Sequence, residues 1–202
     1  MSAEDPASIL RFWFGERPEG AATDPGCARL WWSKQPAVDD EMHQRFGALV
    51  EKAGQGQLDS WAAEPEGRLA LILLVDQFAR NIHRGTPASF ALDPLARRWC
   101  LEGLELKAFD GLLPIQRVFA CLPLEHSESI EHQDRCVAQM QALRDQTTAP
   151  AEREVFDGYV NYAERHREII RRFGRFPHRN AVLGRTSTPE EIAFLQTPGS
   201  SF

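Results

Sequence analysis

The stretch AEREVFDGYVNYAERHREIIRRF, residues 151–173, has the apolar spacing that decides the fold class. Its apolar side chains recur every three or four residues: Phe156, Tyr159, Val160, Ala163, Ile169, Ile170 and Phe173. This period places them on one face of an α-helix. Gly174 follows directly, as glycine does at many helix ends. The stretch therefore predicts one long amphipathic helix.

The rest of the chain carries similar punctuation, with prolines opening apolar segments and glycines closing several of them. These segments predict helices over about residues 6–14, 36–53, 66–83, 93–106, 114–122, 128–144 and 188–195. No segment alternates apolar and polar residues convincingly enough to be a strand. We expect an all-α fold of about eight helices in antiparallel hairpins, forming one domain over residues 1–202.

The composition narrows the class of partner. The chain of 202 residues is 43% hydrophobic and has a formal net charge of −6. That balance argues against nucleic acid or an anionic membrane as the main partner. The longest purely apolar run, Leu69 to Val75, is too short to span a bilayer. The chain has no signal-peptide pattern and its four cysteines form no C-x-x-C pair, so we expect a cytoplasmic protein with reduced cysteines.

A first polar cluster lies late in the otherwise apolar segment 66–83. Asp76 and Arg80 are four residues apart, as are Gln77 and Asn81, so each pair shares a helix face. Burying these side chains requires hydrogen-bond partners. The cluster is either a structural network that fixes helix packing or one wall of a polar pocket.

A second cluster, Glu125-His126-Ser127-Glu128, lies at the junction between two apolar helices. A histidine beside carboxylates suits a general base. The spacing of Glu128 and His132 also suits a pair of metal ligands on a helix. The structural alternative is that Ser127 caps the next helix and Glu128 lies in its first turn.

A third cluster breaks the acidic balance of the chain. Between residues 165 and 185 there are seven arginines and one acid, Glu168. His166 lies on the apolar stripe of its helix and is expected in the core. The loop after Gly174 gathers four polar side chains beside an aromatic residue: Arg175, His178, Arg179 and Asn180. It suits a small carboxylate or phosphate ester, or it is a solvated basic loop with internal salt bridges.

These three clusters together resemble a known family. The sequence resembles the bacterial domain-of-unknown-function family numbered 924, from residues 9–14 to the tail at 198–202. The marks are Asp76-Gln77-Phe78 with Arg80-Asn81, Pro123-Leu124 with His126-Ser127-Glu128, and the string from Arg172 to Asn180. The resemblance implies a tetratricopeptide-like helical stack and assigns no activity. It also implies an apolar residue at position 125, so Glu125 departs from the pattern and His126 and Glu128 are the preferred catalytic residues.

Our leading hypothesis is a pocket between helices that binds a small anionic molecule. Asp76, Gln77, Arg80 and Asn81 would form one wall, and the loop 175–180 would contact the anion. His126 would be the general acid or base, oriented by Glu128. Such a shared site requires His126 to lie within about 12 Å of Arg80 or Arg179.

Two other hypotheses remain open at this stage. Stacked helix hairpins also bind protein partners, so the chain could be a non-enzymatic adaptor. A metal-dependent enzyme would use His126 and Glu128 with His132 or His166. The chain has no phosphate-binding loop, dinucleotide fingerprint, zinc-protease motif or serine-hydrolase motif, so we predict no cofactor and no metal.

Overall fold

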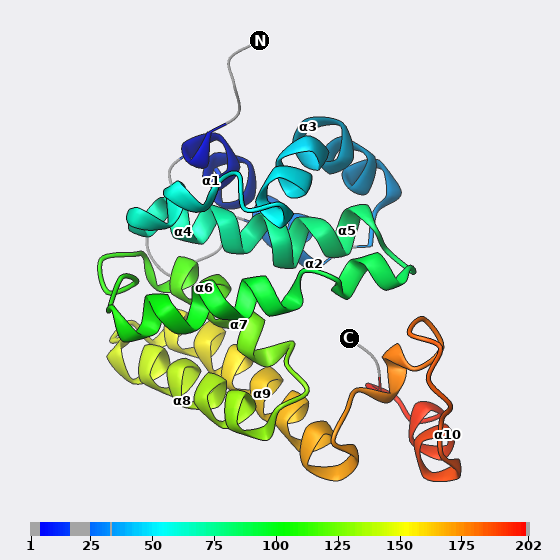
Figure 1. The fold of residues 1–202 in the computed structure, drawn as a ribbon. Coiled ribbons are helices and arrows are strands. Elements are labelled where there is room, and N and C mark those ends of the chain that lie inside the picture. Colours follow the sequence, from blue (N-terminus) through cyan, green and yellow to red (C-terminus); the bar gives the residue numbers. More distant parts are fainter. Residues whose placement is uncertain (1–4, 17–24, 33, 201–202) are drawn as a thin grey trace.

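The structure is a computed structural model that describes residues 5–16, 25–32 and 34–200. Within these ranges the chain forms helices joined by turns, with no strand (Figure 1). The predicted all-α class is therefore confirmed. The finer prediction of a tetratricopeptide-like stack stays a prediction.

The α-helices are α1 (Pro6–Phe14), α2 (Pro25–Trp32), α3 (Pro36–Gly54), α4 (Pro65–Ile72), α5 (Ala79–Ile82), α6 (Asp93–Glu105), α7 (Pro114–Glu125), α8 (Ile130–Gln146), α9 (Pro150–Phe173) and α10 (Pro189–Leu195). Shorter helical turns are η1 (Asp59–Ala63), η3 (Pro87–Phe90) and η4 (Pro177–Arg179). A π-helical segment, η2 (Leu73–Phe78), joins α4 to α5, so these three elements form the helix predicted over 66–83. Helix α2 is not among the helices predicted from the sequence.

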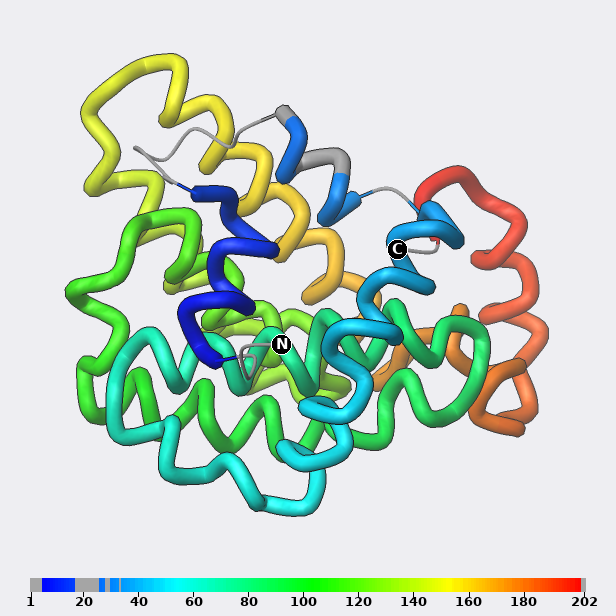
Figure 2. Tube along the Cα trace, turned by 90° about the horizontal axis from the view of Figure 1, so that it is seen from above, coloured from blue at the N-terminus to red at the C-terminus, as the bar shows by residue number. Residues whose placement is uncertain are grey.

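The helices are arranged in layers. Helices α8 and α9 form an antiparallel hairpin, α7 packs on α8, and α6 packs on α7. Helix α4 packs against α1, α6 and α7. Figure 2 shows the same arrangement from above, with α10 at one side of the molecule beyond the end of α9. None of the helices in the described ranges is long and apolar enough to cross a membrane.

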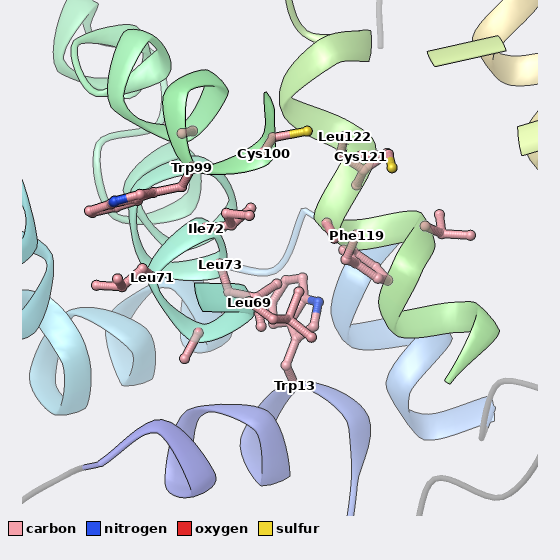
Figure 3. Close-up of a cluster of buried hydrophobic side chains, with 14 of the residues drawn as sticks. Trp13, Leu69, Leu71, Ile72, Leu73, Trp99, Cys100, Phe119, Cys121 and Leu122 are labelled. Carbon is pink, nitrogen blue, oxygen red and sulfur yellow. The ribbon is translucent and has the colours of Figure 1, made fainter. Parts of the chain in front are cut away.

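The apolar faces of these helices meet in a core that runs from Ile9 to Ala163. Trp13 extends from α1 toward Leu69 of α4, and its ring centroid lies 5.6 Å from that of Phe119 on α7 (Figure 3). The predicted stripe of α9 enters the same core through Phe156 and other buried residues. The four cysteines are buried, and no disulfide joins any two of them.

Helix α7 extends further than predicted, since it continues through Pro123 to Glu125. Proline costs a helix one backbone hydrogen bond and clashes with the preceding turn. Only two residues follow Pro123 in α7, so the disruption is confined to the last turn. Because α7 continues past Pro123, Glu125 is the last residue of this helix and His126 is its C-terminal cap.

Candidate active site

A cavity of about 820 Å³ lies between α2, α5, α9 and the C-terminal end of α7. This volume is typical of sites for small molecules. Its walls combine basic, acidic, amide, histidine and aromatic side chains: Trp31, Trp32, Lys34, Gln77, Arg80, Asn81, Arg84, Phe90, Glu125, His126, Tyr159, Tyr162, His166, His178 and Arg179. Smaller and apolar residues complete the lining: Gly85, Ser89, Leu122, Val155, Gly158 and Val182.

The structure brings members of all three predicted clusters to this cavity. Gln77, Arg80 and Asn81 line it from the first cluster, His126 from the second, and His178 and Arg179 from the third. Asp76 lies directly behind the wall and is fully buried. The proximity required of a shared site is met, because Arg179 Nη1 lies 2.9 Å from the His126 carbonyl oxygen.

Asp76 belongs to the π-helical segment η2, in which every residue is buried. Such segments widen one turn of a helix and occur frequently at functional sites. The Asp76 carboxylate accepts hydrogen bonds from Gln77 Nε2 at 2.6 Å and from Arg80 Nε at 3.4 Å. Burial favours its neutral form, but His126, Arg80 and Gln77 outweigh burial and hold the pKa of Asp76 well below its usual range. Asp76 is therefore an ionised carboxylate beneath the cavity wall.

His126 uses one ring nitrogen to contact this carboxylate. His126 Nδ1 lies 2.7 Å from Asp76 Oδ1. Since the ionised carboxylate only accepts, Nδ1 carries the proton and Nε2 is the unprotonated nitrogen of the neutral ring. Burial and the nearby Arg80 lower the pKa of His126, against the opposing effect of Asp76. His126 is therefore a neutral imidazole at pH 7 on the cavity wall.

Arg80 and Arg179 lie side by side over the ring of Phe90. Their guanidinium carbons are 5.2 and 4.9 Å from its centroid. Asp93 joins them, with Oδ1 2.7 Å from Arg80 Nη2 and Oδ2 3.8 Å from Arg179 Nη1. Burial lowers the pKa of Arg179 to about 10, so it remains a cation at neutral pH. Among the described residues, nothing accepts a hydrogen bond from Arg80 Nη1 or Arg179 Nη2.

A third arginine on the lining is already neutralised. Arg84 Nε and Nη2 donate to the two Asp39 carboxylate oxygens at 2.7 and 2.9 Å, and Nη2 also donates to Asn81. This bidentate pair resembles the contact that an anionic ligand would make. Arg84 Nη1 also has no acceptor among the described residues, but the Arg84 side chain is 37% exposed, against 17% for Arg80 and 7% for Arg179.

Another part of the lining is aromatic, which was not predicted from the sequence. Trp31 and Trp32 come from α2, and Tyr159 and Tyr162 come from α9. Trp31 is buried and donates to the Trp13 carbonyl at 2.8 Å, whereas Trp32 is 51% exposed. Tyr159 was interpreted as an ordinary core residue because its spacing matches the stripe of α9. Periodicity cannot separate a side chain that faces a cavity from one that faces a packed core.

Glu125 was set aside in favour of Glu128, yet Glu125 is the residue that lines the cavity. Burial, with a smaller effect from Asp76, raises the pKa of Glu125 to about 8. The Nδ1 atom of His166 is 3.8 Å from Glu125 Oε1 and 2.9 Å from the Tyr162 carbonyl. Burial lowers the pKa of His166 to about 3 and that of His178 to about 4. These three groups are uncharged at neutral pH.

Glu128, Arg175 and Asn180 do not line the cavity. Glu128 binds Arg185 through both carboxylate oxygens at 2.7 and 3.0 Å and accepts from the Phe176 backbone N–H at 2.8 Å. Arg175 binds Glu191 at 2.6 and 2.8 Å, and Asn180 Nδ2 donates to the same carboxylate. The expectation that Glu128 orients His126 is therefore wrong. The turn at residues 126–129 directs Glu128 toward the C-terminal segment, and Asp76 takes the orienting position.

The Glu128 and His132 pair, which the alternative metal-dependent hypothesis would use, does not come together. Ser127 Oγ lies 2.8 Å from His132 Nδ1, while Glu128 is occupied by Arg185. Helix α8 begins at Ile130 with Ser129 as its N-terminal cap, so Ser127 is not the cap that the sequence suggested. In the part of the chain that the structure describes, no three His, Cys, Asp or Glu side chains are arranged to hold a metal ion.

Comparison with known proteins agrees with the resemblance seen in the sequence. The model of a family described as "Bacterial protein of unknown function (DUF924)" matches residues 9–199. A solved structure of a protein of unknown function from Agrobacterium tumefaciens shares 37% sequence identity and has a TM-score of 0.79. The match covers 95% of this chain and 96% of that one. None of the curated proteins matches the chain significantly.

Proposed function

Because the chain belongs to the DUF924 family of bacterial proteins of unknown function, we propose its function from the cavity alone: it binds a small anionic molecule and acts on it as an acid–base enzyme. His126 is the base, Asp76 positions it, and Arg80 with Arg179 bind the anionic group. The aromatic wall holds the apolar part of the same molecule.

The observation that carries this proposal is the 2.7 Å contact between Asp76 Oδ1 and His126 Nδ1 at the wall of the cavity. A buried ionised carboxylate on Nδ1 fixes the imidazole tautomer and stabilises the imidazolium that forms when Nε2 takes a proton. A side chain that only supports helix packing does not need an unprotonated nitrogen beside an 820 Å³ space. The arrangement suits removal of a proton from a bound molecule or from a water beside it.

The anionic class of ligand follows from the two arginines. Each has one terminal nitrogen without an acceptor among the described residues, and both nitrogens belong to side chains on the cavity wall. The sharing of Asp93 and the stacking on Phe90 hold the two guanidinium groups in place before any ligand arrives. Arginine nitrogens fixed in this way suit the oxygens of a carboxylate or phosphate.

The first experiment is a thermal-shift screen of small carboxylates and phosphate esters, followed by calorimetric titration of each hit. We expect some compounds to raise the Tm of the protein, because a ligand that binds only the folded state stabilises it. Arg179→Gln should abolish this increase. Arg175→Gln is the matched control, since Arg175 belongs to the same loop but contacts Glu191 outside the cavity. Equal losses in the two variants, or no hit at all, would contradict the proposal.

The second experiment tests the base. Each ligand that binds is incubated with the wild-type protein and with His126→Gln, and its conversion is followed by NMR. Turnover by the wild type that is lost in the variant, with binding retained, is the expected result. If both proteins bind the ligand and neither converts it, the catalytic part of the proposal is wrong and only the binding part stands.

A further inference from the structure

The cavity contains a carboxyl group that the proposed base and anion contacts do not use. Glu125 is 4% exposed and precedes His126 directly in the chain. Its backbone carbonyl accepts from Gln133 Nε2 at 2.5 Å, which fixes the main chain at this position. Within the described ranges, no group donates a hydrogen bond to the Glu125 carboxyl oxygens. His166 Nδ1 lies 3.8 Å from Glu125 Oε1 and is within hydrogen-bond distance of the Tyr162 carbonyl instead.

Three features of the surroundings of Glu125 disfavour a negative charge on its carboxyl group. A buried carboxylate without donors loses its hydration and gains nothing in return. Glu125 is also the last residue of α7, where the helix dipole presents its negative end. The ionised Asp76 lies under the same wall. Glu125 is therefore a carboxylic acid with a hydrogen to donate.

A buried carboxylic acid needs an acceptor for its hydrogen. Arg80 and Arg179 on the cavity lining are cations that only donate hydrogen bonds. In the described ranges no side chain is hydrogen-bonded to the Glu125 carboxyl group, which leaves the molecule that fills the space to supply the acceptor. Since the arginines take the anionic group, the group opposite Glu125 is a neutral oxygen such as a carbonyl.

Resting on the proposed function, we propose that Glu125 determines substrate specificity by donating a hydrogen bond to a carbonyl oxygen of the substrate. The substrate class is a carboxylate that carries a second, neutral carbonyl and an apolar or aromatic body, as 2-oxo acids and N-acyl amino acids do. The carboxylate binds Arg80 and Arg179, the carbonyl binds Glu125, and the apolar body lies against Trp31, Trp32 and Tyr159.

The test compares two acids that differ only at the carbonyl, phenylpyruvate and 3-phenylpropionate, by isothermal titration calorimetry at pH 6.5. The wild type should bind phenylpyruvate about tenfold more tightly, the effect of one hydrogen bond of about 1.4 kcal/mol. Glu125→Gln keeps an amide donor and should keep most of this preference. Glu125→Met has a similar volume and no donor, so it should bind both acids equally and as tightly as the wild type binds 3-phenylpropionate.

Repeating the titrations at pH 9.5 distinguishes the carboxylic acid donor of the wild type from the amide donor of Glu125→Gln. Ionisation of Glu125 should remove the preference in the wild type, whereas Glu125→Gln cannot ionise and should keep it. This comparison stands even if Glu125→Met fails to fold. A protonated-carboxylic-acid band in the infrared spectrum of the protein alone, lost in Glu125→Gln, is a second readout that needs no ligand.

The outcomes separate this inference from the proposed function. If the wild type binds both acids equally, or if Glu125→Met keeps the preference, Glu125 does not select a carbonyl and the inference is overturned while the anion site stands. If neither acid binds but other anions do, the stated substrate class is overturned. If no carboxylate or phosphate binds, both proposals are overturned.

Discussion

Two regions of this molecule contain similar arginine–carboxylate networks but differ in what the networks enclose. Around the cavity, Asp76 and Asp93 bind Arg80 while nitrogens of Arg80 and Arg179 remain without acceptors among the described residues. In the C-terminal segment, Arg185 and Arg175 are each bound by both oxygens of one glutamate. The arginines of the first network line the cavity, whereas neither Arg175 nor Arg185 lines it, and their glutamate pairs hold the C-terminal segment together. Arginine content alone therefore does not identify a ligand site.

The largest expected effect is on kcat, and it comes from substituting the proposed base, His126. His126→Gln should lower kcat by about 10²- to 10⁴-fold once a substrate is identified, because a positioned general base contributes about this much. Asp76→Asn should also lower kcat strongly, since the amide favours the wrong imidazole tautomer. Steady-state kinetics check both variants. Retention of at least half of the wild-type kcat in His126→Gln would remove His126 from the catalytic role.

The next effect concerns the two kinds of arginine at the cavity. Arg80→Gln should weaken binding of an anionic ligand about tenfold, because it removes a charged hydrogen-bond donor that faces the ligand. Arg84→Gln is the matched control, since its guanidinium is already bound by Asp39. Calorimetric titration of the two variants makes the comparison. A larger loss of affinity in Arg84→Gln than in Arg80→Gln would show that Arg84, and not Arg80, contacts the anion.

In the C-terminal network the same kind of substitution should affect stability instead of binding. Glu128→Ala removes the partner of Arg185 and of the Phe176 backbone N–H, and should lower the free energy of unfolding by about 1–3 kcal/mol. Urea unfolding measures this loss. The Glu128→Ala variant should keep the ligand affinity of the wild type. The control variants are Arg175→Gln and Asn180→Ala in the same C-terminal network. If Glu128→Ala loses more affinity than these controls, Glu128 contributes to the cavity after all.

The smallest effect is a difference in the sign of the pH dependence of stability. The hydrogen bond from Arg175 is the main cause that lowers the pKa of Glu191 to about 2. Its contribution is therefore present above the unfolded pKa of 4.5 and is lost as the pH falls toward 2. Glu125 has the opposite shift, to about 8, so its contribution is complete below pH 4.5 and declines as the pH rises to 8.

Denaturant unfolding at pH values from 3 to 9 separates these two slopes. Glu191→Gln should flatten the acid side only, and Glu125→Gln should flatten the decline between about pH 5 and 8 only. If Glu125→Gln leaves the decline between about pH 5 and 8 unchanged, the carboxyl group is ionised in the folded protein and the comparison between the two regions is wrong.

The parts of the fold that the sequence predicted are those set by local pattern. The stripe of residues 151–173 predicted α9 to within one residue, Pro150–Phe173. Helix α2 was missed because PGCARLWW follows a stretch rich in Gly, Pro and Asp, and its helical character depends on Trp31 packing against Trp13 and Phe119. Such long-range contacts leave no trace in local spacing.

The candidate site was predicted in part for the same reason. Each polar cluster could be found from its contrast with the apolar residues around it. The partner of His126 could not, because Asp76 is 50 positions away and the nearer Glu125 and Glu128 are equally plausible from sequence. In the structure, Asp76 contacts the base, Glu125 lines the cavity and Glu128 binds the C-terminal segment.

The most direct test of the central claim is the protonation of the His126 ring, measured by ¹⁵N–¹H NMR of the free protein at pH 7. A neutral ring with the proton on Nδ1 and an unprotonated Nε2, changed in Asp76→Asn, is the predicted result. A proton on Nε2, or a fully protonated ring at this pH, would leave no base facing the cavity and would contradict the account.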